Sequence, residues 1–132
     1  MKKVAAFDID GTIFRSSLLI ELVNRLVERG LMPPETRALY AEEETKWLDR
    51  KGDYESYIAA VVKVFGSRIK GLPYDEVSYI AGEIIEERKG RVYRYTRDLV
   101  KDLKEQGYFL LAVSHSPLFI VNGFGFDEIF YQ

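Results

Sequence analysis

The sequence predicts an α/β protein in which a parallel sheet is interrupted by an inserted bundle of helices. A short apolar run at residues 4–7 is typical of a strand that is buried on both faces. A second apolar run covers residues 108–113 and follows a segment with helical periodicity. A succession of amphipathic segments fills the interval between the two runs. Because strands that alternate with helices usually pair in parallel, these observations together indicate a parallel sheet.

Four amphipathic helices are predicted in the interval, over about residues 17–30, 33–49, 53–65 and 73–89. Ser16 or Ser17 can cap the first helix, and Asp53 can cap the third. The second helix can open at Pro34 and the fourth near Pro73, because proline is tolerated in the first turn. A glycine after each segment is typical of a helix end. Together the four segments predict a helical subdomain.

The remaining elements complete the sheet. A fifth helix is predicted over residues 96–106, where Gly107 ends it before the second strand. A short helix over residues 117–122 and a third strand over residues 128–131 follow. The domain organisation predicted from this order is an α/β part made of residues 1–14 and 93–132, with residues 15–92 as the helical insert.

Composition excludes several functional classes. The chain has 132 residues, which fits one domain, and its net charge of −2 disfavours a dedicated nucleic-acid binder. It has no cysteine and a single histidine, His115, which excludes disulfides, thiol catalysis and zinc sites built from cysteine or several histidines. No apolar run approaches the length of a membrane span or a signal-peptide core, so we expect no membrane contact and a cytoplasmic location.

The chemistry is concentrated in the segment Asp8-Ile9-Asp10-Gly11-Thr12, directly after the first strand. Strand alternation sends the side chains of Asp8 and Asp10 to the same side, where two carboxylates repel each other and need a cation or a shared proton. Mg²⁺ is a natural partner for such oxygen ligands. Gly11 lets a phosphate approach the backbone, and Thr12 supplies a hydroxyl and an N–H. Asp8 can attack phosphorus while Asp10 handles protons. The alternative is an ordinary Asp-Gly turn, but no matching second strand follows it.

Ser114 and His115 follow the second strand, so the parallel sheet places them at the same edge as Asp8. This edge is where α/β proteins bind ligands. Taken alone, Ser114 is better explained as the cap of a following helix or as a turn hydroxyl than as a binding residue. A lone histidine such as His115 is more often solvated or structurally bonded than bound to substrate.

Residues 7–14, Phe-Asp-Ile-Asp-Gly-Thr-Ile-Phe, resemble the first signature of the haloacid dehalogenase superfamily of phosphohydrolases. The resemblance implies a Rossmann-like core, with Asp8 as nucleophile and Asp10 as general acid and base. It also implies that the backbone carbonyl of Asp10, rather than its side chain, binds Mg²⁺. Ser114 and the N–H of His115 would hold the phosphoryl oxygens. The implied substrate is a small phosphorylated metabolite.

The helical insert resembles the cap of the phosphoserine-phosphatase-like branch of this superfamily. Phosphoserine phosphatases typically carry a glutamate nine residues after the nucleophile, where this chain has Ser17, which makes phosphoserine doubtful as the substrate. Arg15, Ser17 and Glu21 are the candidates for substrate contact from the cap side; the alternative is an ordinary capped helix with a solvated face. We expect the tyrosines of the insert to pack helix against helix, namely Tyr40, Tyr54, Tyr57, Tyr74 and Tyr79.

The sequence departs from the family pattern after Ser114. The family's third motif is a lysine and its fourth an acidic pair, but residues 117–132 contain no lysine and only Asp127 and Glu128 as acids. Three hypotheses remain open: a truncated phosphatase, a catalytically incompetent phosphate-binding or interaction module, and half of a split protein. An uncovered edge of the first strand would favour a homo-oligomer or strand exchange. A phosphate-receiver domain is disfavoured, because receivers carry no helical insert of this size.

Overall fold

The computed structural model describes residues 2–9, 17–88, 94–114 and 128–131. Its contacts divide the chain into two compact units. The sheet unit comprises Met1–Leu18 and Ala81–Gln132, and the helical unit comprises Leu19–Ile80. The boundaries of the units therefore fall within two helices, α1 (Leu18–Glu28) and α4 (Tyr74–Arg88).

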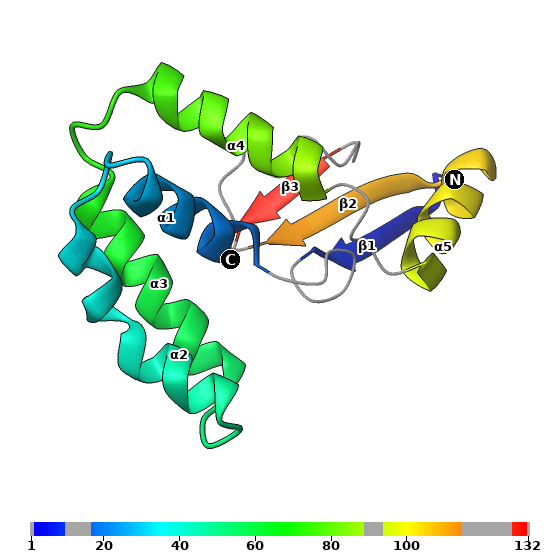
Figure 1. Cartoon of the computed structure of the whole chain (residues 1–132). Helices are drawn as coiled ribbons and strands as arrows, with labels where there is room; N and C mark the ends of the chain where they lie inside the picture. Colours follow the sequence, from blue (N-terminus) through cyan, green and yellow to red (C-terminus); the bar gives the residue numbers. More distant parts are fainter. Residues whose placement is uncertain (1, 10–16, 89–93, 115–127, 132) are drawn as a thin grey trace. The chain divides into compact units, whose positions relative to one another are not determined.

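Three parallel strands form the sheet in the order β1 (Val4–Asp8), β2 (Phe109–Ser114), β3 (Glu128–Tyr131). Figure 1 shows their arrows pointing in one direction, with β2 between the other two. The register pairs Val4 with Phe109 and Asp8 with Val113. The predicted α/β class with a parallel sheet and inserted helices is confirmed. The short helix predicted over residues 117–122 lies outside the described residues.

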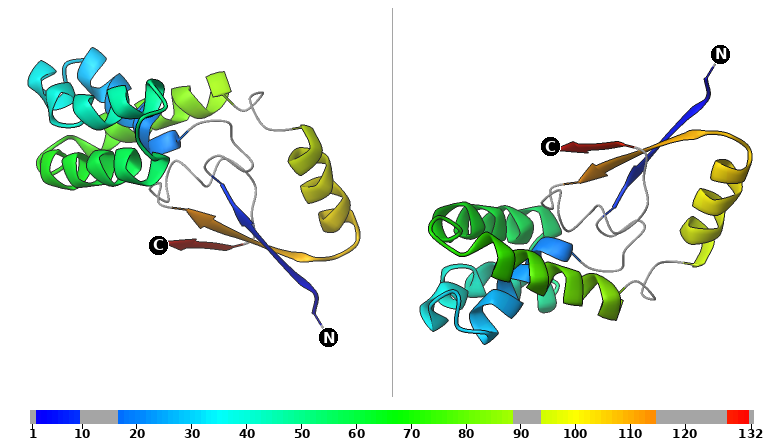
Figure 2. Two further views of the ribbon diagram at one scale, coloured as in Figure 1. Left: turned by 90° about the horizontal axis from the view of Figure 1, so that it is seen from below. Right: turned by 90° about the horizontal axis from the view of Figure 1, so that it is seen from above.

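Helix α5 (Arg94–Glu105) precedes β2 and contacts it. Gly107 makes the connection with a φ of 82°, which is accessible to glycine at little cost. The N–H of Gly107 donates to the carbonyl of Lys104, and that of Tyr108 to the carbonyl of Leu103, each at 3.0 Å. These bonds satisfy the last carbonyls of α5 and turn the chain into β2, as both views of Figure 2 show.

The helical unit is built around α1, whose inward face is almost completely buried. It also contains the 3₁₀-helix η1 (Pro34–Leu39), α2 (Ala41–Leu48), α3 (Tyr54–Arg68) and most of the first half of α4. Helices α2 and α3 lie side by side (Figure 1). The buried apolar side chains of this unit include Leu19, Ile20, Leu22, Val23, Leu26, Met32, Tyr40, Tyr57, Val61 and Ile80. None of the described helices is both long and apolar enough to span a bilayer.

The predicted second helix is wrong as a single element, because Tyr40 divides it into η1 and α2. Tyr40 has φ −127° and ψ 3°, outside the helical range. Its side chain is 1% exposed, and its hydroxyl donates to Oδ1 of Asn24 on α1 at 2.6 Å. The packing of this tyrosine against α1 therefore overrides the helical pattern of the sequence around it.

A second tyrosine continues this packing. The rings of Tyr40 and Tyr57 lie 6.5 Å apart between centroids, and the Tyr57 hydroxyl donates to Oε1 of Glu44 at 3.2 Å. Burial raises the pKa of Tyr57, and the negative charge of Glu44 raises it further. Both tyrosines pack between helices as predicted, whereas Tyr74 and Tyr79 are 67% and 68% exposed and do not.

Candidate functional site

Asp8 is the last residue of β1, and Ser114 is the last residue of β2. Asp8 is paired with Val113, the residue before Ser114, in the parallel ladder. Beyond this pair, the N–H of Ile9 donates to the carbonyl of Val113 at 3.2 Å. Neighbouring strands lie about 4.8 Å apart. The structure thus brings the backbones of Asp8 and Ser114 together at the carboxyl edge of the sheet.

The two side chains lie on opposite faces of that edge. Side chains alternate along a strand, so Asp8 shares the face of its partner Val113, and Ser114 shares the face of Ala112. Asp8 is exposed, whereas Ser114 is 1% exposed. A ligand can therefore reach Asp8 from solvent. The Ser114 hydroxyl can meet the same ligand only around the end of the sheet.

The residues on either side of Asp8 in the sequence fix its position in the strand. Ile9, directly after it, is 0% exposed and anchors the strand end on the covered face. Phe7, directly before it, is half-buried on the same face as Ile9. A carboxylate between two inward-facing apolar residues must point outward. The alternation of the sequence is therefore what presents Asp8 to solvent.

The described part of this edge offers one suitable ligand for a hard divalent cation. A carboxylate oxygen, as in Asp8, is a preferred ligand of Mg²⁺. Within residues 2–9, 17–88, 94–114 and 128–131 there is no group of three or more Asp, Glu, His or Cys able to hold a metal. Asp10, the second predicted ligand, lies outside the described residues.

Five residues predicted for the site lie outside the described residues, namely Asp10, Gly11, Thr12, Arg15 and His115. Two cap-side candidates are described. Ser17 immediately precedes α1 and is 1% exposed, and Glu21 lies in the first turn of α1 and is half-buried. An acidic residue in the first turn also favours the helix through the macrodipole. Ser17 belongs to the sheet unit, and Glu21 belongs to the helical unit.

The helical unit contains a cavity of about 390 Å³ that the sequence did not predict. It lies where the end of α1 meets the first turns of α4, and its lining residues are Arg29, Leu31, Asp75, Glu76, Tyr79 and Ile80. One wall comes from the residues that follow α1, and the other comes from the first turns of α4. No pattern in the sequence indicates that Arg29 and Asp75, far apart along the chain, line one space.

A parallel sheet with an acidic residue at the carboxyl end of its first strand defines a class of α/β proteins that act on ligands at this edge. Residues 2–131 match the family of haloacid dehalogenase-like hydrolases. The chain therefore belongs to this family, and the resemblance noted in residues 7–14 is confirmed. No curated protein matches the chain.

Solved structures share the fold at low sequence identity. A Bordetella pertussis Tohama I protein described as having unknown function has a TM-score of 0.71 at 14% identity; the match covers 100% of this chain and 60% of that one. A phosphoserine phosphatase from T. onnurineus, in complex with NDSB-201, has a TM-score of 0.53 at 23% identity, with 99% and 57% covered. A phosphoserine phosphatase described as a phospho-aspartyl intermediate analogue has a TM-score of 0.51 at 22% identity, with 98% and 56% covered. The chain thus spans between 56% and 60% of the length of these neighbours.

Proposed function

We propose that the protein is a phosphatase that hydrolyses the phosphate monoester of a small metabolite through a phosphorylated Asp8. The observation that carries this proposal is the exposed Asp8 carboxylate at the carboxyl end of β1, beside the end of β2, in a haloacid dehalogenase-like hydrolase. The phosphoserine phosphatases that share the fold support it, including the one described as a phospho-aspartyl intermediate analogue.

The reaction takes two displacements at phosphorus. In the first, a carboxylate oxygen of Asp8 forms a bond to phosphorus and the bond from phosphorus to the ester oxygen breaks. Asp10 gives its proton to that oxygen, so the alcohol leaves neutral. In the second, a water oxygen attacks phosphorus, its proton passes to Asp10, and the bond to Asp8 breaks. Inorganic phosphate leaves, and both aspartates return to their starting states.

The other residues of the edge hold the phosphoryl group. Gly11 allows the phosphate close to the backbone, and Thr12 offers a hydroxyl and an N–H. Ser114 and the N–H of His115 would donate from the end of β2. Hydrogen-bond donors fixed in advance at such positions stabilise the charge that develops on the phosphoryl oxygens.

Mg²⁺ is the cofactor that this donor chemistry accepts. The Asp8 carboxylate and Asp10, through its backbone carbonyl, are the residues that would hold it. When bound, the ion supplies positive charge that offsets the repulsion between a carboxylate and an anionic phosphate ester.

The part of the substrate beyond the phosphate is proposed to contact Arg15, Ser17 and Glu21. Ser17 stands where phosphoserine phosphatases typically have a glutamate, which argues against phosphoserine itself.

In the described sheet β1 has one neighbour, β2, so its other edge is the proposed place for a second copy or an exchanged strand.

A non-catalytic phosphate-binding module is the second candidate function. It is favoured by one observation, namely that the buried Ser114 side chain lies on the face of the sheet opposite to Asp8. A hydrogen-bond donor on the opposite face stabilises the charge of a phosphoryl group on Asp8 less than a donor beside it. Such a module would bind phosphate at the same edge without turning over an ester.

Hydrolysis of p-nitrophenyl phosphate with Mg²⁺ separates the two candidates. We expect Asp8→Asn to lower the turnover of the wild-type chain by at least about a thousandfold, because the amide cannot act as the nucleophile. Asp102→Asn is the matched control, since Asp102 is exposed on α5, and it should keep wild-type turnover. Undiminished turnover in Asp8→Asn contradicts the mechanism. Saturable binding of inorganic phosphate without any wild-type turnover identifies the module instead.

A further inference from the structure

The cavity in the helical unit is separate from the residues of the proposed hydrolysis. Its volume of about 390 Å³ is within the range of small-molecule sites, which is roughly 300–1,000 Å³. All of its lining residues belong to Leu19–Ile80, so it is a feature of the helical unit alone. It combines two carboxylates, a guanidinium group, a phenol ring and two aliphatic side chains.

One wall is fixed by the turn that ends α1. Gly30 has a φ of 78°, and its N–H donates to the carbonyl of Val27 at 3.0 Å. The N–H groups of Leu31 and Met32 both donate to the carbonyl of Leu26, at 2.9 and 3.1 Å. Met32 is 1% exposed, so the chain after the turn is anchored in the core. Arg29 and Leu31 therefore extend into the cavity from a turn with little freedom.

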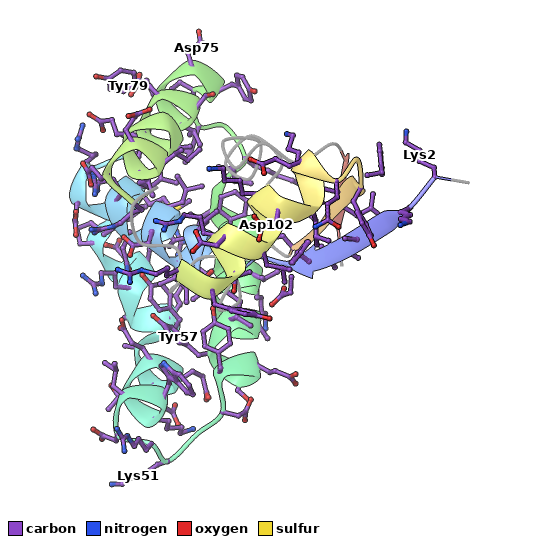
Figure 3. All side chains as sticks on the ribbon, turned by 90° about the vertical axis from the view of Figure 1, so that its right-hand side faces the viewer. Lys2, Lys51, Tyr57, Asp75, Tyr79 and Asp102 are labelled. Carbon is purple, nitrogen blue, oxygen red and sulfur yellow. The ribbon has the colours of Figure 1, made fainter. Side chains whose placement is uncertain are left out.

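The other wall is formed by the first turns of α4. Asp75 and Tyr79 are four residues apart, and so are Glu76 and Ile80, so the two pairs form adjacent rows on the helix. Figure 3 shows Asp75 and Tyr79 together at the same end of α4. Val77 and Ile80, 3% and 4% exposed, anchor this segment in the core. The cavity thus has an apolar floor at Ile80 and Leu31 and a charged rim.

We propose that this cavity binds a free α-amino acid with an apolar side chain. The carboxylates of Asp75 and Glu76 would take the ammonium group, and the guanidinium of Arg29 would take the carboxylate. The apolar side chain would cover Leu31 and Ile80, with the exposed ring of Tyr79 beside it. A zwitterion matches a rim with both signs of charge. A phosphate ester does not, because the two carboxylates would repel it.

Titration of the ¹⁵N-labelled chain with L-leucine and with L-phenylalanine, followed by NMR, tests this proposal without relying on catalysis. We expect saturable shifts of the Leu31 and Tyr79 amide signals with at least one of the two amino acids. N-acetyl-L-leucine and L-leucinamide each lack one of the two charges. We expect each to bind at least tenfold more weakly than L-leucine, because it lacks one of the two charges that the rim is proposed to bind.

Substitutions of the charged rim residues test whether these residues bind the amino acid. The double variant Asp75→Asn with Glu76→Gln should weaken binding at least tenfold, and so should Arg29→Gln. Glu55→Gln is the matched control, because Glu55 is an exposed acid in the first turn of α3 and does not line the cavity. It should bind like the wild type. The proposal is overturned if neither amino acid gives saturable shifts, or if the double variant binds as tightly as Glu55→Gln.

Discussion

Ile9 donates its backbone N–H to the carbonyl oxygen of Val113 at 3.2 Å, one step beyond the last pair of the β1–β2 ladder. This bond ties the residue after Asp8 to the residue before Ser114. Because Ile9 is also completely buried, the strand end that carries Asp8 is held both by the sheet and by the core. The backbone of the proposed nucleophile is therefore held in place by the sheet and by packing.

Replacing Ser114 by alanine should reduce catalysis without disturbing the sheet. The change removes a hydroxyl at the end of β2 and leaves a side chain that fits the same buried position. If the hydroxyl donates to the phosphoryl group, kcat falls by about 100-fold in steady-state assays with p-nitrophenyl phosphate. Ser67→Ala is the control, because the Ser67 hydroxyl donates only within α3, to Val64 at 2.9 Å. Equal kcat values for the two variants would remove Ser114 from the site.

Leu26 is a position at which we expect truncation to destabilise the helical unit. Its side chain is 0% exposed on α1, so Leu26→Ala leaves a cavity and should lower the free energy of unfolding by about 3 kcal/mol. Leu48→Ala makes the same chemical change at a side chain that is 71% exposed. Its cost should stay below about 0.5 kcal/mol. Urea unfolding followed by circular dichroism measures both, and similar losses would contradict the assignment of α1 to the core.

Thr36 offers a substitution that should stabilise the protein. Its Oγ1 is buried and has no hydrogen-bond partner among the residues that the structure describes, and its side chain is 0% exposed. Thr36→Val keeps the shape and removes the unsatisfied hydroxyl, so the free energy of unfolding should rise by about 1 kcal/mol. Thermal unfolding of the two proteins side by side measures the change. A clear loss of stability would show that the hydroxyl has a partner.

The cap of α3 should make stability depend on pH in the acid range. Asp53 accepts hydrogen bonds from the N–H and the hydroxyl of Ser56, at 2.7 and 2.9 Å, and these bonds lower the pKa of its carboxyl group. A lowered folded-state pKa gives stability that is present above the ordinary value of about 3.9 and is lost as the pH falls through the folded-state pKa.

Asp53→Asn isolates this contribution, because asparagine also caps helices but does not titrate. The difference in unfolding free energy between the wild type and the variant should be constant from about pH 5 to pH 8. Below about pH 4 it should shift against the wild type. Urea unfolding at several pH values measures the difference, and a difference that does not change on acidification would exclude a charged cap.

The features that were predicted correctly are those with a local physical signal. The apolar run ending at Asp8 specifies a strand, and Asp53 caps α3 through its own side chain. The expectation that this strand is buried on both faces is wrong, because its residues alternate between exposed and half-buried. Gly30 and Gly107 end helices at positions where φ is positive, which glycine adopts easily. The third strand has the predicted bounds, Glu128–Tyr131.

The features that were missed depend on contacts between distant residues. Tyr40 divides a helical segment because it packs against α1, and α3 runs through Gly66 to Arg68 instead of ending before it. Val62 and Val64 are both apolar, but in α3 Val64 is buried whereas Val62 is 39% exposed. The sequence alone does not distinguish Tyr74 and Tyr79, which are exposed, from Tyr40 and Tyr57, which are buried. The difference depends on how the helices pack in the folded chain.

The pairing of β1 with β2 also has a consequence for the order of folding. Val4 pairs with Phe109, so the ladder joins nearly opposite ends of the sequence, with the whole helical unit in between. Closing so long a loop costs chain entropy before any strand contact repays it. The helical unit relies on contacts between nearby segments, so we expect it to form first and to shorten the loop that remains. The strand end that carries Asp8 would then be among the last parts of the chain to reach its final place.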